Sequence, residues 1–175
     1  MAYTYYIDAY NVIHYCPKLQ ALARHDFETA RDSLIETAAR FCAATGHRVR
    51  VIFDGRGRQS ETEAPFRGAP GLEIVYSPGH QSADTVIERE VFSATNRREL
   101  VIVSGDRGIR DLCRALGALV MAPTNFLAEV EAASKELKTT TKHLYQTPGD
   151  LSRVEDHLDE SALRRLRKLR KKLEE

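Results

Sequence analysis

Acidic residues follow successive apolar runs along this chain, and this pattern constrains the fold more than any other feature of the sequence. Asp8 ends the first run, Asp54 ends the second, and Asp84 and Asp106 open the helical segments after the third and fourth. The runs are short enough to be strands and cover residues 3–7, 48–53, 72–76 and 99–103. Segments of helical periodicity separate them. Such alternation predicts an α/β fold with a doubly wound, mainly parallel sheet of four or five strands.

The segments between the strands carry helix start and stop signals. Asp26 is placed to cap the longest helix, and Gly46 is placed to end it. Helices are expected over residues 26–45, 82–95, 106–116 and 124–137, and a short fifth strand over residues 118–121. After the first strand we expect a polar turn and a loop, with one helical turn near residues 19–23. Residues 55–71 are rich in Gly, Pro and Arg, which predicts a long loop without regular structure.

The four acids are far apart in sequence but are expected to meet in space. Parallel strands deliver their carboxyl ends to one edge of the sheet, where open α/β folds bind ligands. Four anions in one crevice repel each other unless cations neutralise them or some stay protonated. All-oxygen ligands suit Mg²⁺ or Mn²⁺, so we expect Asp8, Asp54, Asp84 and Asp106 to form a metal site. Phosphodiester hydrolysis is the reaction that such a site favours.

Each candidate residue also has a purely structural interpretation. Asp54, Asp84 and Asp106 are all placed to cap a helix or to interact with its dipole. Asn11 and Ser104 are candidates for orienting a water or a phosphate, and both are also ordinary turn residues. Glu88 and Asp111 lie one turn into their helices and are expected at the surface; their role stays open. Four acids at four junctions are more than capping preferences alone would supply.

Arginines near the acids are candidates for contacting RNA phosphates, although solvated surface positions would explain them equally well. These residues are Arg56, Arg58, Arg67, Arg107 and Arg110. A second basic feature is the segment from Arg164 to Lys172, which holds seven basic residues and no acid. We therefore expect three parts: a domain over residues 1–137, a linker over 138–158, and a basic helix over 159–175 that packs on the same domain.

Bulk composition adds little to the functional prediction. Lys and Arg number 26 against 25 Asp and Glu, so net charge argues neither for nor against nucleic acid. The three cysteines lie far apart without zinc-type spacing, which favours a reduced, cytoplasmic protein. No apolar stretch approaches the roughly 20 residues of a membrane span. Neither GxGxxG nor GxxxxGK[ST] occurs, so no nucleotide cofactor is expected.

The segments that carry the acids resemble a known nuclease family. IDAYNVI resembles the opening motif of the NYN domain, a branch of the PIN-like nuclease superfamily, and VIFDGRG, SADTVIERE and VIVSGDRGIRD resemble its later motifs in order. The long helix with its following strand, ARDSLIETAARFCAATGHRVRVIFDG, and the ending HLDESALRRLRKLRKKLE resemble the YacP-like subfamily. The resemblance covers nearly the whole chain. Two departures are Ala9, where the family commonly has Gly, and a last motif, SGDRGIRD, that is poorer in acids.

The resemblance implies a PIN-like three-layer α/β sandwich with endoribonuclease activity. It implies a Mg²⁺ or Mn²⁺ site at Asp8, Asp84 and Asp106, with Asp54 as a fourth member. It further implies similarity to a ribosome-associated enzyme that enters the A site and cuts translated messenger RNA. The basic helix and the arginine-rich loop would then face ribosomal RNA.

Two other functions compete with a metal-dependent endoribonuclease. One is a catalytically inactive module that binds RNA or the ribosome. The other is a phosphatase of the haloacid dehalogenase kind, which also has an Asp after its first strand. That phosphatase pattern needs a second Asp two residues later, where this chain has Tyr10. The endoribonuclease is therefore the preferred prediction.

Overall fold

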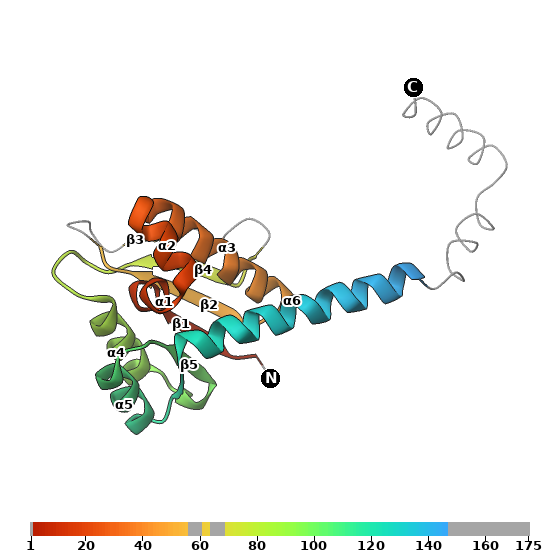
Figure 1. Ribbon diagram of the computed structural model, residues 1–175. Helices are drawn as coiled ribbons and strands as arrows, with labels where there is room; N and C mark the ends of the chain where they lie inside the picture. Colours follow the sequence, from red (N-terminus) through yellow and green to blue (C-terminus); the bar gives the residue numbers. More distant parts are fainter. Residues whose placement is uncertain (1, 56–60, 64–68, 147–175) are drawn as a thin grey trace, which may run out of the picture. The chain divides into compact units, whose positions relative to one another are not determined.

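The computed structural model describes residues 2–55, 61–63 and 69–146 (Figure 1). Its strands are β1 (Thr4–Asp8), β2 (Arg48–Phe53), β3 (Glu61–Glu63), β4 (Leu72–Tyr76), β5 (Leu100–Val103) and β6 (Leu119–Met121). Its α-helices are α1 (Ala9–Tyr15), α2 (Pro17–His25), α3 (Phe27–Thr45), α4 (Ala83–Ser93), α5 (Arg107–Ala115) and α6 (Pro123–Gln146). Apart from the consecutive helices α1 to α3 and the consecutive strands β2 to β4, strands and helices alternate along the chain, as the sequence predicts.

The strands form one sheet in the order β3-β4-β2-β1-β5-β6. All neighbouring strands pair in parallel except β3, which runs antiparallel to β4 at the edge. The chain moves outward from β1 through β2 to β4 and then returns to place β5 on the other side of β1. Strand order thus reverses at β1, and open α/β sheets bind ligands beyond the strand ends at such a point. Asp8, the last residue of β1, lies there.

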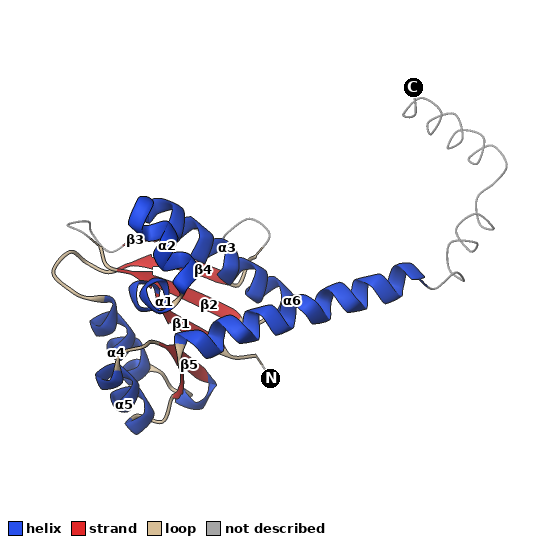
Figure 2. Ribbon diagram, in the orientation of Figure 1, coloured by secondary structure: helices blue, strands red, loops and turns tan. Residues whose placement is uncertain are grey.

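Helices cover both faces of the sheet, which gives three layers (Figure 2). Side chains of α1, α2, α3 and the first part of α6 pack into one apolar core with alternate residues of β1, β2, β4 and β5. Side chains of α4 and α5 pack into a second core on the opposite face. This arrangement confirms the predicted α/β sandwich with a mainly parallel sheet.

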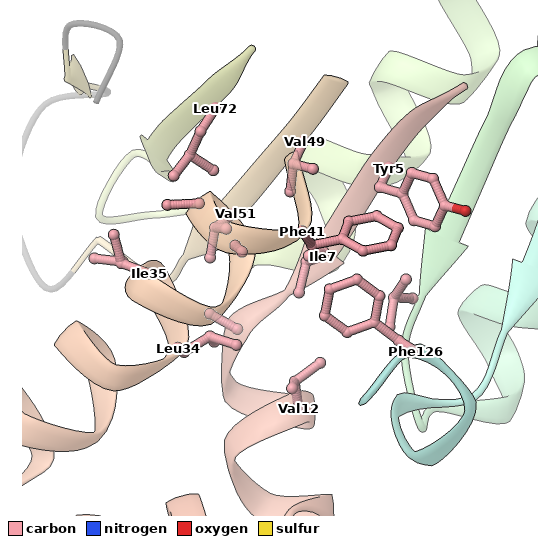
Figure 3. Close-up of a cluster of buried hydrophobic side chains, with 14 of the residues drawn as sticks. Tyr5, Ile7, Val12, Leu34, Ile35, Phe41, Val49, Val51, Leu72 and Phe126 are labelled. Atoms are coloured by element: carbon pink, nitrogen blue, oxygen red, sulfur yellow. The ribbon is translucent and has the colours of Figure 1, made fainter. Parts of the chain in front are cut away.

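The rings of Tyr5, Phe41 and Phe126 lie together in the larger core (Figure 3). The Phe41 ring of α3 lies edge-on to the Tyr5 ring of β1, with ring centroids 5.0 Å apart, and edge-on to the Phe126 ring of α6 at 5.3 Å. Phe41 and Phe126 are both fully buried. The three rings tie α3 and the start of α6 to the central strand, so this face of the sheet is held as one packed layer.

The predicted caps of the longest helix are confirmed. Asp26 accepts hydrogen bonds from the backbone N–H groups of Glu28 and Thr29, and Gly46 ends α3 in the left-handed conformation with φ 69°. Between these caps the apolar stripe, which includes Ala30 and Leu34, is buried. Capping and periodicity together account for why this segment folds as a helix.

The loop predicted after the first strand is wrong, because two helices occupy it. Asp8 caps α1 by accepting a hydrogen bond from the backbone N–H of Asn11, and Pro17 occupies the first turn of α2. Seven residues with Val and Ile among them give no helical signal, so the cap and burial on the sheet decide the conformation. Ala9 is fully buried in the first turn of α1, and no described residue other than glycine has a positive φ. Alanine at this position therefore adds no backbone strain.

Two further boundaries differ from the prediction. The segment expected to be an unstructured loop contains β3, whose three residues are too few to give a periodic signal. The last described helix, α6, continues to Gln146 instead of ending near residue 137, since no Pro or Gly interrupts it before Pro148. The first part of the predicted linker is therefore helical. Residues 147–175, including the predicted basic helix, lie outside the described residues, and Lys135 is the last residue of the compact unit that contains the sheet.

In the described ranges, none of the helices has the length and apolar character needed to cross a membrane.

Candidate active site

Asp8 is the buried centre of the candidate site. Its carboxylate is only 3% exposed at the end of the central strand. The Asn11 side-chain amide donates to Oδ2 at 2.5 Å, the Asn11 backbone N–H donates to Oδ1 at 3.1 Å, and the Ser104 hydroxyl donates to Oδ2 at 3.3 Å. Burial raises the pKa of Asp8, and these hydrogen bonds oppose the rise. Asn11 and Ser104 thus fix the orientation of this carboxylate.

Asp84 lies in the first turn of α4 and is electrostatically linked to the other three acids. Its pKa is raised from 3.8 to about 6, mainly by burial and further by the charges of Asp8, Asp106 and Asp54. Asp84 Oδ1 is buried and receives no hydrogen bond from a donor in the described part of the chain. The surroundings of Asp84 therefore favour a nearby positive charge or a proton retained on its carboxyl group.

Asp54 and Asp106 are exposed members of the group, and both also stabilise helix starts. Asp54 Oδ1 accepts a hydrogen bond from the backbone N–H of Ala83 at 2.6 Å. Asp106 Oδ1 accepts from the backbone N–H groups of Gly108 at 2.6 Å and Ile109 at 3.2 Å. Both residues therefore have the structural role that was expected for them. The second carboxylate oxygen of each, Oδ2, accepts none of these hydrogen bonds.

Carboxylate oxygens are suitable ligands for a hard divalent cation, but these carboxylates do not form a closed site. Within the described ranges, no three His, Cys, Asp or Glu side chains are positioned together to hold an ion. Mg²⁺ usually binds one or two carboxylates and completes its shell with water and substrate phosphate, so a closed protein cage is not required. The buried and unpartnered oxygen of Asp84, beside the buried carboxylate of Asp8, is where positive charge would relieve the repulsion.

The remaining predicted residues separate into those near the acids and those at the surface. Glu88 lies on the buried side of α4, where its charge and that of Asp84 help burial to raise the pKa of Cys113 to about 11. Asp111 is exposed and pairs with Arg114 at 2.8 Å, so it is a surface ion pair. Arg107 is exposed, and Arg110 is half-buried with an Nε that has no partner among the described residues. The other arginines named above, Arg56, Arg58 and Arg67, lie outside the described residues.

The profile of the YacP-like NYN domain matches residues 5–171, which is nearly the whole chain. The chain belongs to the YacP-like NYN domain family. NYN domains are nuclease-like, so membership indicates a nuclease-type function related to RNA.

Relatives of this YacP-like NYN domain come from Bacillus subtilis. The curated protein YacP of strain 168, which is described as uncharacterized, is 27% identical over 142 residues that cover 79% of this chain and 81% of YacP. A crystal structure of a mutant of Rae1 (YacP) is similar with a TM-score of 0.68 and 25% identity, over 93% of this chain and 95% of that one. A second Rae1 structure matches with a TM-score of 0.65 and 24% identity, over 98% and 95% of the two chains, and supports the fold alone.

One aromatic residue beside the acids of this NYN domain was not predicted from the sequence. The Tyr15 ring at the end of α1 is 53% exposed and lies over Gly105, the residue before Asp106. A Cβ at Gly105 would come within 2.1 Å of this ring, so only glycine allows the contact. The signal available in the sequence was the glycine between Ser104 and Asp106, which permits close approach of another group.

Proposed function

We propose that this NYN domain is an endoribonuclease that hydrolyses phosphodiester bonds in single-stranded RNA. The observation that supports the proposal most directly is the electrostatic coupling of Asp84 to Asp8, Asp54 and Asp106. These acids come from four separate segments and lie at the strand-order reversal. Purely structural carboxylates have no need to share such a location, whereas phosphoryl-transfer sites commonly do.

Mg²⁺ or Mn²⁺ would be held by Asp8, Asp84 and Asp106, with Asp54 as a fourth ligand. When bound, such an ion polarises a phosphoryl oxygen and lowers the pKa of water. Asn11 and Ser104 keep the Asp8 carboxylate in one orientation through their hydrogen bonds. The exposed rings and arginines beside the site, such as Tyr15 and Arg107, are placed to contact the bases and phosphates of a single strand.

Cleavage of an internally labelled RNA in the presence of Mg²⁺ or Mn²⁺ tests the proposal. Replacement Asp84→Asn should lower the cleavage rate by roughly 100-fold or more, because it removes a ligand charge from the reacting centre. Asp111→Asn is the matched control, since Asp111 is an exposed acid in a surface ion pair. Equal cleavage by Asp84→Asn and the parent would remove the assignment.

Metal binding supplies a readout independent of activity. Titration of Mn²⁺ into the protein, followed by electron paramagnetic resonance, should show binding that Asp84→Asn weakens and Asp111→Asn preserves. If neither the parent protein nor Asp111→Asn binds Mn²⁺ in the presence of RNA, the proposed cofactor is wrong.

We further propose that the substrate is messenger RNA on the ribosome and that the basic segment of residues 159–175 contacts ribosomal RNA in the A site. The support is the family similarity and the run of seven basic residues from Arg164 to Lys172. Co-sedimentation with ribosomes should decrease when the chain is shortened from Ser161 onward. Unchanged co-sedimentation would exclude this segment as the docking element.

A catalytically inactive RNA- or ribosome-binding module is the second candidate. The open arrangement of the acids in the described part of the chain favours it, because no group of three potential ligands is pre-assembled. The two candidates differ in one measurement: an inactive module would bind RNA without cleaving it at any Mg²⁺ or Mn²⁺ concentration.

A further inference from the structure

A pocket of about 340 Å³ lies beside the acids, and apart from Asp54 its lining residues take no part in the function described so far. Its volume is at the lower end of the roughly 300–1,000 Å³ that is typical of small-molecule sites. Asp54 lines this pocket and also interacts electrostatically with Asp8 and Asp84, so the pocket borders the acid group directly.

Two stacked aromatic pairs form much of the pocket wall. Tyr10 of α1 and Phe27 of α3 stack with ring centroids 5.0 Å apart and an interplanar angle of 18°. Phe53 and Tyr76, the last residues of β2 and β4, stack at 5.7 Å and 25°. Tyr10, Phe27 and Tyr76 are only half-buried, so flat ring surface borders the cavity from the helical side and from the sheet side.

The polar groups of the pocket favour an uncharged nucleobase over a phosphate group as the ligand. Glu28 and Asp54 are both exposed carboxylates at its edge, and two anions repel a phosphate group. A nucleobase carries no charge and presents N–H donors that carboxylates accept. Arg31 also lines the pocket and is half-buried. Its hydrogen bonds to Asp32 use Nε and Nη2, so among the described residues Nη1 has no hydrogen-bond acceptor and could donate to the base.

We propose that this pocket binds a nucleobase of the RNA strand, one that flanks the phosphate held at the acids. The inference rests on the proposed function for its substrate. A base entering the cavity would stack on the rings of Tyr10, Phe27 or Tyr76 while its edge meets Glu28 and Arg31. The strand would thereby be fixed in position beside Asp54. Tyr10 and Phe27 are positioning residues in this scheme because they touch the base and not the reacting phosphate.

Titration with the four uncharged ribonucleosides, followed by NMR of the aromatic side chains, tests the pocket without any cleavage reaction. Ring resonances of Tyr10 and Phe27 should shift, whereas those of Phe92, which is 69% exposed on α4 and lies outside the pocket, should not. Tyr10→Phe keeps a ring and should preserve binding. Tyr10→Leu removes the ring and should weaken binding by roughly 5- to 150-fold, the range for one base stacked on one aromatic side chain.

A second measurement relates the pocket to RNA. Binding of a short fluorescent single-stranded RNA, with a chelator present to prevent cleavage, should weaken for Tyr10→Leu but not for Tyr10→Phe or Phe92→Ala. Absence of pocket shifts at millimolar nucleoside, or equal RNA binding by Tyr10→Leu and Tyr10→Phe, would overturn the inference.

The outcomes separate this inference from the proposed function. RNA cleavage that depends on Asp84, combined with no nucleoside binding in the pocket, would refute the base site and leave the endoribonuclease standing. Pocket binding without any cleavage would support the base site and refute the nuclease.

Discussion

Asp84 makes the stability of this protein depend on pH in a direction opposite to that of most surface carboxylates. Its folded-state pKa is about 6 against an ordinary value of 3.8, so between these values the folded state binds the proton more tightly than the unfolded state. The free energy of unfolding therefore falls as pH rises through this window. At neutral pH the ionised side chain opposes folding.

Asp84→Asn should raise the melting temperature at pH 7.5 in the absence of divalent ions. The expected gain is about 1 kcal/mol after allowance for solvent screening, which corresponds to roughly 2–4 °C for a chain of this size. The gain should shrink as the pH is lowered toward 4, because the parent carboxyl is then protonated too. Differential scanning calorimetry measures both quantities. Asp111→Asn serves as control and should show no such gain; a lower melting temperature for Asp84→Asn at pH 7.5 would contradict the prediction.

Cation binding should show the complementary pH dependence. If Asp84 holds the proposed ion, protons and the divalent cation compete for it, and its pKa of about 6 places this competition close to neutral pH. We expect Mn²⁺ affinity to fall by about tenfold per pH unit below 6. Isothermal titration between pH 5 and 7.5 measures this slope, and a flat profile would show that Asp84 does not hold the ion.

Two glycines near the site should respond differently to alanine because they approach different kinds of group. A Cβ at Gly55 would come within 1.8 Å of the backbone carbonyl oxygen of Ser77, which cannot move without displacing the end of β4. Gly55→Ala should therefore cost roughly 1–3 kcal/mol of stability. The three atoms nearest to a Cβ at Gly105 all belong to the half-exposed Tyr15 ring, which can rotate away.

Gly105→Ala should accordingly cost less stability than Gly55→Ala while displacing Tyr15 from its place beside Asp106. Urea unfolding of the two variants gives the comparison, and the ring resonances of Tyr15 report the displacement. A larger loss for Gly105→Ala than for Gly55→Ala would contradict the prediction.

Helices and strands are predictable from the sequence where their own residues contain the caps or the apolar pattern that stabilises them. α3 has both caps and a continuous stripe, and β5 is a continuous apolar run, so local physics is sufficient for both. Three elements were missed in whole or in part: α1, most of α2, and β3. Two of them, α1 and β3, depend on contacts that are distant in sequence. β3 exists only through pairing with β4, and α1 begins at the same Asp8 that serves the candidate site.

For the molecule as a whole, Phe126 joins the start of the last described helix to the core around the sheet. Phe126 is fully buried between β1 and α3, although it lies near the start of the last described helix. Phe126→Ala should lower the free energy of unfolding by roughly 3–5 kcal/mol. Glu131→Ala, at an exposed position on the same helix, should change it by less than about 0.5 kcal/mol. Urea denaturation measures both, and a small effect of Phe126→Ala would show that α6 is not part of the cooperative unit.

The same scale explains what the sequence could reveal about the site. Acids after parallel strands share an edge by topology, so the location of Asp8, Asp84 and Asp106 at one edge of the sheet was predictable from the order of elements, whereas their role as ligands stays a prediction. The nucleobase pocket was not predictable, because its rings come from four elements whose spacing depends on packing of the whole sheet. Stacking of Tyr10 on Phe27 leaves no periodic signal in the chain.

All three thiols of the chain are buried, and they are divided between the two faces of the sheet. Cys16 and Cys42 belong to the core that includes α3, whereas Cys113 belongs to the core formed by α4 and α5. A thiol reagent can therefore modify each one only when its own layer opens. Alkylation rates followed by mass spectrometry would measure how often each face of the sheet opens, without any engineered cysteine.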